Sequence, residues 1–282
     1  MHYIIYNNKS NNSNNEEYIN QIKTKLEGMV RLISIFDVKS YKDLFEKLNS
    51  EDDLTLIGGD GTMNYFVNSI DDVNFPCDVY FAAGGTGNDF IKDVEDQLDE
   101  LGRVKINDYV RNLPTVYVNG MKKHFINGIG YGIDGYACEA ADNFIKKHPN
   151  KKVNYTSITV KGLLFHYKRP NAEVIVDGDT KKFKKVYLAS TMKGRYYGGG
   201  MLVAPEQDRK KEDKELTILV WNGSSKLKTL MNFPKIFKGE HVTLKNVTIK
   251  KGHSVEIRFD KPTSLQIDGE TVLNVYSYKV EA

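Results

Sequence analysis

The sequence predicts a two-domain protein, in which an α/β domain with a mostly parallel sheet is followed by a β-rich sandwich domain. Its length of 282 residues suits one large domain or two ordinary ones. In the first hundred residues, short apolar runs alternate with segments of helical periodicity, which is typical of βαβ units. Beyond about residue 104, short alternating strands and turn residues dominate. We therefore expect the α/β domain at 1–104 and the β-rich domain at 105–282.

The first domain is expected to alternate four strands with three helices. The predicted strands are 2–6, 31–36, 53–59 and 78–85, and the predicted helices are 16–29, 40–49 and 62–70. Within 16–29, Ile19, Ile22 and Leu26 recur at spacings of three and four, so they share one helical face. Ser40 is the expected N-cap of the second helix. Ligands of such sheets bind outside the carboxyl ends of the strands.

The second domain is expected to consist of two packed antiparallel sheets with helices at one end. Asn119-Gly120, Asp177-Gly178 and Lys251-Gly252 are candidate turns between its strands. Helical patterns occupy 133–147 and 153–168.

Composition excludes several classes of protein. Lys plus Arg is 40 and Asp plus Glu is 37, and this net charge of +3 argues against a dedicated nucleic-acid binder. No run approaches the ~18 apolar residues of a membrane helix, and the N-terminus lacks the pattern of a secretory signal. Cys77 and Cys138 are too few for a disulfide framework or a zinc site. We therefore expect a cytoplasmic protein with reduced thiols.

A glycine-rich loop follows the third predicted strand. It reads Gly58-Gly59-Asp60-Gly61-Thr62, and a helix begins at its end. Glycines let the backbone approach a ligand closely, and the amides of a helix start suit a phosphate. The loop matches neither the Walker nor the Rossmann pattern. The carboxylate of Asp60 would repel a phosphate unless it holds a metal or accepts a proton. Alternatively, Asp60 is a structural cap of the helix.

A second loop of the same kind follows the fourth predicted strand. It reads Gly84-Gly85-Thr86-Gly87-Asn88-Asp89. Since its strand is expected to neighbour the third strand, both loops should reach the same edge of the sheet. Two Gly-Thr loops with embedded acids indicate a site for a nucleotide and its metal. Asp89 could orient a metal-bound water or could bracket the loop through hydrogen bonds.

Five ordered motifs resemble those of the diacylglycerol kinase catalytic-domain family, the lipid kinases that include ceramide and sphingosine kinases. The matching segments are GGDGT at 58–62, GGTGNDF at 84–90, FINGIGYGIDG at 125–135, GGGMLVAP at 198–205 and IDGE at 267–270. They span most of the chain, and their order makes the resemblance specific. The related NAD kinases share the first motif, but no Asn-Glu pair followed by their Ser/Thr-Gly-rich segment is found here. The resemblance implies the same two-domain layout, with nucleotide bound by the first domain and lipid by the second.

The resemblance implies that ATP phosphates lie on the first loop. The implied contacts are Gly58, Gly59, Asp60, Gly61, Thr62 and Asn64, with Thr86 and Asp89 from the second loop. The turn after the first strand normally reads Asn-Pro-x-Ser-Gly, and here it reads Asn-Asn-Lys-Ser-Asn at 7–11. Asn7 and Ser10 remain suitable donors in this turn, and Lys9 could reach a phosphate.

The resemblance also implies the catalytic groups. Bacterial soluble members use the glutamate of the late Asp-Gly-Glu motif as general base, which is Glu270 here, with Asp268 beside it. Asp60 is the rival base, and it could equally act through Mg²⁺. If the resemblance is set aside, Asp268-Gly269 reads as a hairpin turn and Glu270 as a solvated strand residue.

A structural Mg²⁺ is implied in the second domain, on the segment after Ala204-Pro205. Asp213 would supply its side chain, and the carbonyls near Lys210 and Glu215 would complete the site. Two departures stand in this segment, since the family's glycine is Lys214 and its later acid is Thr217.

Two residues are implied to face the substrate. Asp134 sits where the family places an acid toward the lipid head group. Lys193 could neutralise a phosphate, or could simply be an exposed lysine.

We therefore expect an ATP- and Mg²⁺-dependent lipid kinase, with diacylglycerol as the first candidate acceptor and phosphatidic acid as the product. The alternatives are a kinase of a long-chain base or a polyol, and a non-catalytic lipid- or nucleotide-binding regulator. Lipid at a membrane surface is the expected partner, and an edge strand of the second domain could pair in a homodimer.

Three lysine clusters could attract anionic lipid. They are Lys146, Lys147, Lys151 and Lys152, then Lys181, Lys182, Lys184 and Lys185, then Lys250 and Lys251. The segment 153–168 could line a lipid entry or pack against the core.

Overall fold

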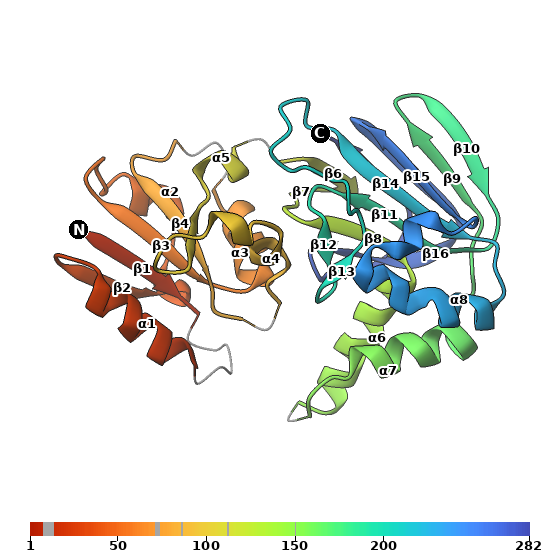
Figure 1. Ribbon diagram of the computed structural model, residues 1–282, viewed down its shortest axis with the longest axis horizontal. Coiled ribbons are helices and arrows are strands. Elements are labelled where there is room, and N and C mark those ends of the chain that lie inside the picture. The colour runs from red at the N-terminus through yellow and green to blue at the C-terminus, as the bar shows by residue number, and fades with distance from the viewer. Residues whose placement is uncertain (8–13, 71–73, 86, 112, 150) are drawn as a thin grey trace. The chain divides into compact units, whose positions relative to one another are not determined.

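The computed structural model describes residues 1–7, 14–70, 74–85, 87–111, 113–149 and 151–282. The chain forms two compact units, Met1–Leu113 and Pro114–Ala282 (Figure 1). The boundary lies beyond the expected position after residue 104, because strand β5 (Arg103–Lys105) and helix α5 (Asn107–Val110) still pack on the first unit. The Asn107 side chain accepts a hydrogen bond from the amide of Val79 at 2.8 Å and donates to the carbonyl of Cys77 at 3.0 Å.

Unit 1 is an open five-stranded sheet in the order β2-β1-β3-β4-β5. Four strands are parallel and β5 alone runs antiparallel. The remaining strands are β1 (His2–Tyr6), β2 (Val30–Ser34), β3 (Asp53–Gly58) and β4 (Asp78–Ala83). The chain turns back at β1, which pairs with β2 on one side and with β3 on the other. Ligands of doubly wound sheets bind at such a switch point, outside the carboxyl ends of the strands.

The helices of unit 1 are short. They are α1 (Asn14–Lys25), α2 (Tyr41–Phe45), α3 (Asp60–Val67), α4 (Asp89–Asp93) and α5, with 3-10 turns η1 (Ile35–Asp37) and η2 (Glu95–Gln97). Ser40 is confirmed as the N-cap of α2, since its hydroxyl accepts a hydrogen bond from the amide of Asp43. Ile19 and Ile22 of α1 are buried against Ile4 and Ile57 of the sheet, as their spacing predicts.

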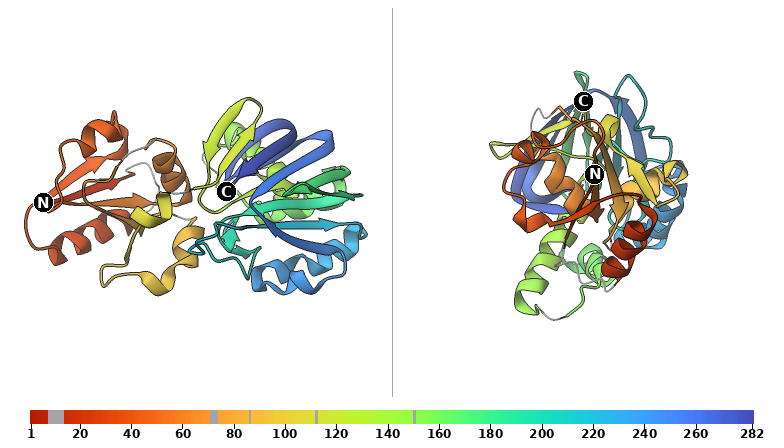
Figure 2. Two further views of the ribbon diagram at one scale, coloured as in Figure 1. Left: turned by 90° about the horizontal axis from the view of Figure 1, so that it is seen from above. Right: turned by 90° about the vertical axis from the view of Figure 1, so that its left-hand side faces the viewer.

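Unit 2 is an antiparallel sandwich (Figure 2). One continuous path runs β15-β14-β11-β8-β16-β17-β6-β7, and the hairpin β9-β10 joins it at β16. These strands are β6 (Thr115–Val118), β7 (Met121–His124), β8 (Gly128–Gly132), β9 (Ala172–Val176), β10 (Asp179–Phe183), β11 (Val186–Met192), β14 (Leu216–Asn222), β15 (Val247–Gly252), β16 (Ser254–Ile267) and β17 (Glu270–Glu281). The small pair β12 (Tyr196–Tyr197) and β13 (Met201–Leu202) stands apart. Apolar side chains from most of these strands meet in one buried cluster.

The long strand β16 belongs to both layers of the sandwich. Its first half pairs with β9, and its last residues pair with β8, with register shifts between Arg258 and Leu265. The predicted turn at Lys251-Gly252 is wrong, because both residues pair with β14 inside β15. The chain changes layer at His253 instead, where the Asp177 carboxylate accepts the backbone amide.

The other two predicted hairpin turns of unit 2 are confirmed. Both residues of Asn119-Gly120 and of Asp177-Gly178 have positive φ angles, which type I′ turns require.

The helices of unit 2 lie outside the sandwich (Figure 1). They are α6 (Ile133–Lys147), α7 (Tyr155–Lys161), the π-turn η3 (Gly162–His166), α8 (Lys226–Asn232) and the 3-10 turns η4 (Phe233–Lys238) and η5 (Glu240–Thr243). The predicted helix 133–147 is confirmed, and the helical pattern 153–168 divides into α7 and η3. In the described part of the chain, none of the helices has the length and apolar character needed to span a membrane.

Candidate functional site

The two glycine-rich loops lie side by side at the carboxyl edge of the unit 1 sheet. β3 and β4 are parallel neighbours, and Gly58 pairs with Ala83 in register. The amide of Gly84 donates to the carbonyl of Gly58 at 2.8 Å, and the amide of Asp60 donates to the carbonyl of Gly87 at 2.9 Å. The predicted meeting of the two loops is therefore confirmed by backbone hydrogen bonds in both directions.

Glycine is required where the two loops touch. A Cβ on Gly59 would lie 2.7 Å from the carbonyl oxygen of Gly87, and one on Gly85 would lie 2.8 Å from the Cα of Gly59. These contacts are with backbone atoms, which cannot move aside as a flexible side chain can. By contrast, a Cβ on Gly61 would meet no atom of the described residues within 4 Å. Gly59 and Gly85 thus serve the packing of the loops, while Gly61 leaves open space in front of α3.

Asp60 connects the first loop to the start of α4. Its Oδ2 accepts the backbone amide of Asp89 at 2.9 Å, and its Oδ1 accepts the amide of Phe90 at 3.1 Å. The structural-cap interpretation of Asp60 thus describes its geometry, although the helix that it caps is α4 and not its own. Because the carboxylate is held by two amides of the other loop, it fixes the relative position of the two loops.

The remaining predicted nucleotide contacts gather around these loops. Thr62 and Asn64 are buried in α3, and Asp89 is buried at the start of α4. Asn7 follows β1, and the register that pairs Tyr6 with Ile57 brings it level with the end of β3. Ser10, Lys9 and Thr86 lie outside the described residues.

The N-cap residue of α3 is Gly59, which has no side chain with which to cap the helix. Gly59 precedes the helix, and the space beside Gly61 is open. An uncapped helix start with an open glycine suits an anionic phosphate, because the first amides of a helix carry partial positive charge. The residues present in unit 1 therefore fit the phosphates of a nucleotide.

In unit 2, Asp268 organises the segment that precedes β8. Its carboxylate accepts three backbone amides, from Ile126 at 2.7 Å and from Asn127 and Gly128 at 2.9 Å each. Asp268 has a φ of 48° beside Gly269 at 92°, so the pair forms the hairpin turn between β16 and β17. Asp268 is thus both a turn residue and a buried anchor for the Phe-x-Asn motif. Sequence reasoning separated these two roles.

Glu270 begins β17 directly after this turn. Its side chain is half exposed, and its Oε2 lies 2.7 Å from the ammonium of Lys123 on β7. An accessible carboxylate on a rigid strand, held by one cation, is suited to accept a proton. Lys123 was not predicted, because it lies far from Glu270 in the sequence. The segment that follows β7 is held by Asp268, two residues before Glu270, and this brings the end of β7 to the turn.

Two cations hold the same segment from the other side. Arg209 donates from Nη1 to the carbonyl of Ile126 at 2.9 Å and from Nη2 to Oδ1 of Asn127 at 3.1 Å. The backbone amide of Lys193 donates to the carbonyl of Asn127. Lys193 is buried, which rules out its interpretation as an exposed lysine.

The ammonium of Lys193 lies in a cationic environment. Burial lowers its pKa, the charges of Arg209 and Lys214 lower it further, and the charges of Asp208 and Asp213 oppose this shift. A buried cation beside a second cation favours an anionic ligand such as a phosphate. Sequence reasoning missed Arg209, whose signal was its place among the charged residues 206–215.

Asp134 lies buried at the first turn of α6. It accepts a hydrogen bond from the Tyr197 hydroxyl, and this hydroxyl lies 2.7 Å from the hydroxyl of Ser190. Burial raises the pKa of Asp134 to about 6, and the Tyr197 bond opposes this shift. Gly130 leaves room for the carboxylate, since a Cβ there would lie 2.7 Å from Oδ2 of Asp134. Asp134 belongs to a buried polar network beneath β8.

The segment predicted to hold Mg²⁺ is occupied by its own side chains. The ammonium of Lys211 lies 2.6 Å from Oδ2 of Asp213 and 3.2 Å from Oε2 of Glu215. The carbonyl of Glu215 accepts from Nε2 of Gln207 at 2.9 Å. Lys214, at the expected glycine, has a φ of 57°.

The Asp213 carboxylate is therefore paired with an internal ammonium. The Lys211 ammonium lowers the pKa of Asp213, as a metal would, but it takes up the carboxylate itself. At Lys210 the backbone amide donates to the carboxylate of Asp208 at 2.9 Å, whereas the predicted ligand there is the carbonyl. Among the described residues, no group of three His, Cys, Asp or Glu side chains is placed to hold a metal.

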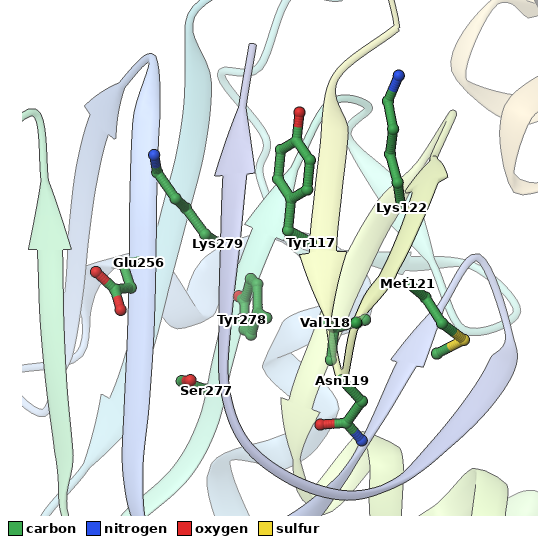
Figure 3. A pocket seen from close by; sticks show the side chains of 10 residues that line it. Tyr117, Val118, Asn119, Met121, Lys122, Glu256, Ser277, Tyr278 and Lys279 are labelled. Carbon is green, nitrogen blue, oxygen red and sulfur yellow. The ribbon is translucent and has the colours of Figure 1, made fainter.

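A shallow hollow of about 310 Å³ lies on the outer face of the sandwich (Figure 3). Tyr117, Lys122, Glu256 and Lys279 are among the residues that line it. It contains none of the predicted site residues.

Comparison with known proteins agrees with this arrangement. Residues 2–115 match the model of the diacylglycerol kinase catalytic domain, and residues 127–278 match the model of the YegS C-terminal NAD kinase beta sandwich-like domain. A Bacillus subtilis (strain 168) protein named "Putative lipid kinase YtlR" is 26% identical over 77% of this chain and 73% of its own length. A Staphylococcus aureus (strain Mu3) protein named "Putative lipid kinase" is 24% identical over 96% of this chain and 94% of its own length.

A solved structure shares the fold. A crystal structure titled as a putative diacylglycerol kinase from Bacillus anthracis str. Sterne covers 99% of this chain and 93% of its own, with a TM-score of 0.68 and 16% identity. At this identity the likeness concerns the two-domain architecture. The two family models together cover both units, and the second alone matches more than half of the chain. The chain belongs to the family that joins a diacylglycerol kinase catalytic domain to a YegS-type β-sandwich domain.

Proposed function

We propose that this protein is an ATP-dependent lipid kinase, which transfers the γ-phosphoryl group of ATP to a lipid hydroxyl. The observation that carries the proposal is the pair of interlocked glycine loops at the carboxyl edge of the unit 1 sheet. Gly59 and Gly85 approach too closely for a Cβ, while Gly61 leaves open space at an uncapped helix start. Family membership and the names of the relatives support the same reaction.

In this proposal the first loop and α3 bind the phosphates of ATP. The amides of the loop would hold the anionic oxygens, and Asp60 would keep the two loops in register. Asn7, Thr62 and Asn64 would supply further polar contacts near the end of the sheet. Magnesium that arrives with ATP would neutralise charge on the transferred phosphoryl group. In this proposal the segment around Asp213 does not contribute to phosphoryl transfer.

Glu270 is the better candidate for the general base. Its carboxylate is half exposed and forms an ion pair with Lys123. By contrast, both carboxylate oxygens of Asp60 accept hydrogen bonds from the backbone amides of Asp89 and Phe90. A base must reach the hydroxyl whose proton it removes. Asp268 would position Glu270 through the hairpin turn that both share. Lys193 and Arg209 would offer positive charge to a phosphate, and Asp134 would face the polar head of the acceptor.

Diacylglycerol is the first candidate acceptor, which would make phosphatidic acid the product. A long-chain base and a soluble polyol are the alternative acceptors. A lipid acceptor is reached at a membrane surface, so we propose a cytoplasmic protein that associates peripherally with membranes.

The test uses the purified full chain with Mg-ATP and dispersed diacylglycerol, a long-chain base and glycerol in separate reactions. The expected result is transfer of labelled phosphate to diacylglycerol. Glu270→Gln should lower kcat by about 10²–10⁴-fold and leave ATP binding unchanged, since a base contributes that much to the rate. The proposal fails if ATP binds while none of the acceptors is phosphorylated, which would indicate a nucleotide-binding regulator.

A further inference from the structure

Two neighbouring elements of unit 2 expose large apolar side chains. Phe165 on η3 is 74% exposed, and Leu227 and Met231 on α8 are 65% and 74% exposed. Leu227 and Met231 are four residues apart, so they share one face of α8. We call these three residues the apolar patch. Exposed apolar groups of this size on adjoining elements mark an interaction surface more often than a chance arrangement.

The two elements are held together, so the patch is a fixed feature of the fold. η3 contacts α8, and the ammonium of Lys226 donates to the carbonyl of Leu164 at 2.8 Å. Leu163 and Tyr167 anchor η3 in the buried cluster that underlies the helices, and Leu230 packs against the same cluster from α8. Since these side chains point inward, the patch residues belong to the outer sides of their elements.

The two sequence segments that carry the patch are rich in cations. Residues 143–172 contain seven Lys and Arg and residues 216–239 contain four, and neither range contains Asp or Glu. Lys161, Lys168, Lys228 and Lys238 are exposed on the elements that carry or adjoin the patch. In the whole chain cations and acids nearly balance, so this separation is local.

We propose that the apolar patch and its exposed lysines dock on a bilayer that contains anionic lipid. Exposed apolar side chains beside exposed lysines complement a surface of acyl chains beneath negative head groups. The inference rests on the proposed function, because a lipid kinase must reach its acceptor at such a surface, and it specifies which face makes the contact.

The test is sedimentation of the full chain with vesicles in the absence of ATP. The protein should bind vesicles of mixed phosphatidylcholine and phosphatidylglycerol, and should bind phosphatidylcholine vesicles much more weakly. Added salt should weaken the binding, because the charge attraction is screened. The triple variant Phe165→Ser, Leu227→Ser, Met231→Ser should lose binding by at least about tenfold. Tyr276→Ser removes an equally exposed ring from β17, where Tyr276 is 58% exposed, and should leave binding unchanged.

A pair of charge variants locates the basic part of the surface. Lys228→Ala with Lys238→Ala should weaken binding by about 30-fold, from about fivefold for each lysine near an anionic surface. Lys182→Ala with Lys184→Ala removes the same charge from the β9-β10 hairpin region and should have little effect. Equal losses for both pairs would overturn the proposal and indicate attraction by net charge alone. Thermal melting of each variant shows that it remains folded.

Other outcomes separate this inference from the proposed function. If the serine variants bind vesicles normally and instead convert a dimer to a monomer in gel filtration, the patch is an interface between two copies. If they lose vesicle binding but phosphorylate detergent-dispersed lipid at the normal rate, docking and catalysis are both supported. If vesicle binding follows the patch while no lipid is phosphorylated, the docking surface stands and the kinase proposal falls.

Discussion

The ammonium of Lys123 on β7 lies 2.7 Å from Oε2 of Glu270, the first residue of β17. This contact gives a surface glutamate a defined position. If Glu270 is the general base, Lys123→Met should lower kcat by about tenfold, because the carboxylate is no longer held at one position. Glu270→Gln should have the larger effect of about 10²–10⁴-fold.

The neighbouring lysine provides the control for this prediction. Lys122 lies on the same strand and lines the outer hollow instead (Figure 3). Steady-state kinetics of Lys122→Met should match the wild type. If the Lys122 and Lys123 variants behave alike, the ion pair does not position the base.

The glycine loops predict opposite effects for two alanine substitutions. Gly59→Ala places a Cβ 2.7 Å from the carbonyl oxygen of Gly87, so we expect a loss of about 1–3 kcal/mol in the free energy of unfolding. Gly61→Ala meets nothing within 4 Å inside α3, and helix propensity predicts equal or higher stability by up to ~1 kcal/mol. The same Cβ would fill the space proposed for phosphate, so ATP binding should weaken. Urea denaturation and calorimetric titration with ATP measure the two effects. A Gly61→Ala protein that binds ATP normally would place the phosphates elsewhere.

The buried carboxyl of Asp134 predicts a pH dependence of stability. Burial raises its pKa from 3.8 to about 6. Between these values the folded protein binds more protons than the unfolded chain, so the contribution of this group to stability falls as pH rises through that window. The full effect is on the order of 2–3 kcal/mol between pH 4 and pH 7.

Asp134→Asn tests this assignment, because the amide keeps an oxygen for the Tyr197 hydroxyl but does not titrate. Denaturation measured at several pH values should show a flatter stability profile for the variant. An unchanged slope between pH 4 and pH 6.5 would mean that Asp134 is not the group responsible.

The ion pairs of Lys211 predict that the second domain needs no divalent metal. The ammonium lies within 3.2 Å of carboxylate oxygens of both Asp213 and Glu215. In the absence of nucleotide, neither Mg²⁺ nor a chelator should change Tm. Lys211→Met removes the internal cation, and Mg²⁺ should then raise the Tm of the variant. A Tm of the wild-type protein that rises with Mg²⁺ would show that the metal displaces Lys211.

Much of the architecture was predictable from local patterns. The alternation of apolar runs with helical periodicity identified the strands and helices of unit 1, and the Asn-Gly and Asp-Gly pairs located two hairpins. Failures occurred where long-range pairing overrides local preference. Lys251-Gly252 resembles a turn, yet β14 holds both residues in a strand. The boundary between the units lies later in the chain than expected, because Asn107 is hydrogen-bonded to β4. No local pattern in the sequence reveals this contact.

The candidate site divides in the same way. Ordered motifs identified Gly58–Thr62, Asp268 and Glu270, because glycine and carboxylate spacing is written in the chain. The hydrogen-bond partners of these residues were not predictable. Arg209 and Lys123 reach the site from distant segments of the chain. In the predicted metal segment, the sequence does not reveal that Lys211 lies between the carboxylates of Asp213 and Glu215.

By itself the sequence determined the fold class, the family and the chemical character of the loops, since these follow from residue type and local spacing. Only the tertiary structure decided what each charged group contacts. It assigned Asp60 to the second loop, Lys211 to the predicted metal ligands, and Phe165 to an exposed position beside α8. The physical reason is that charge interactions and exposure depend on distances between segments far apart in the chain, and these distances are set by strand pairing and core packing.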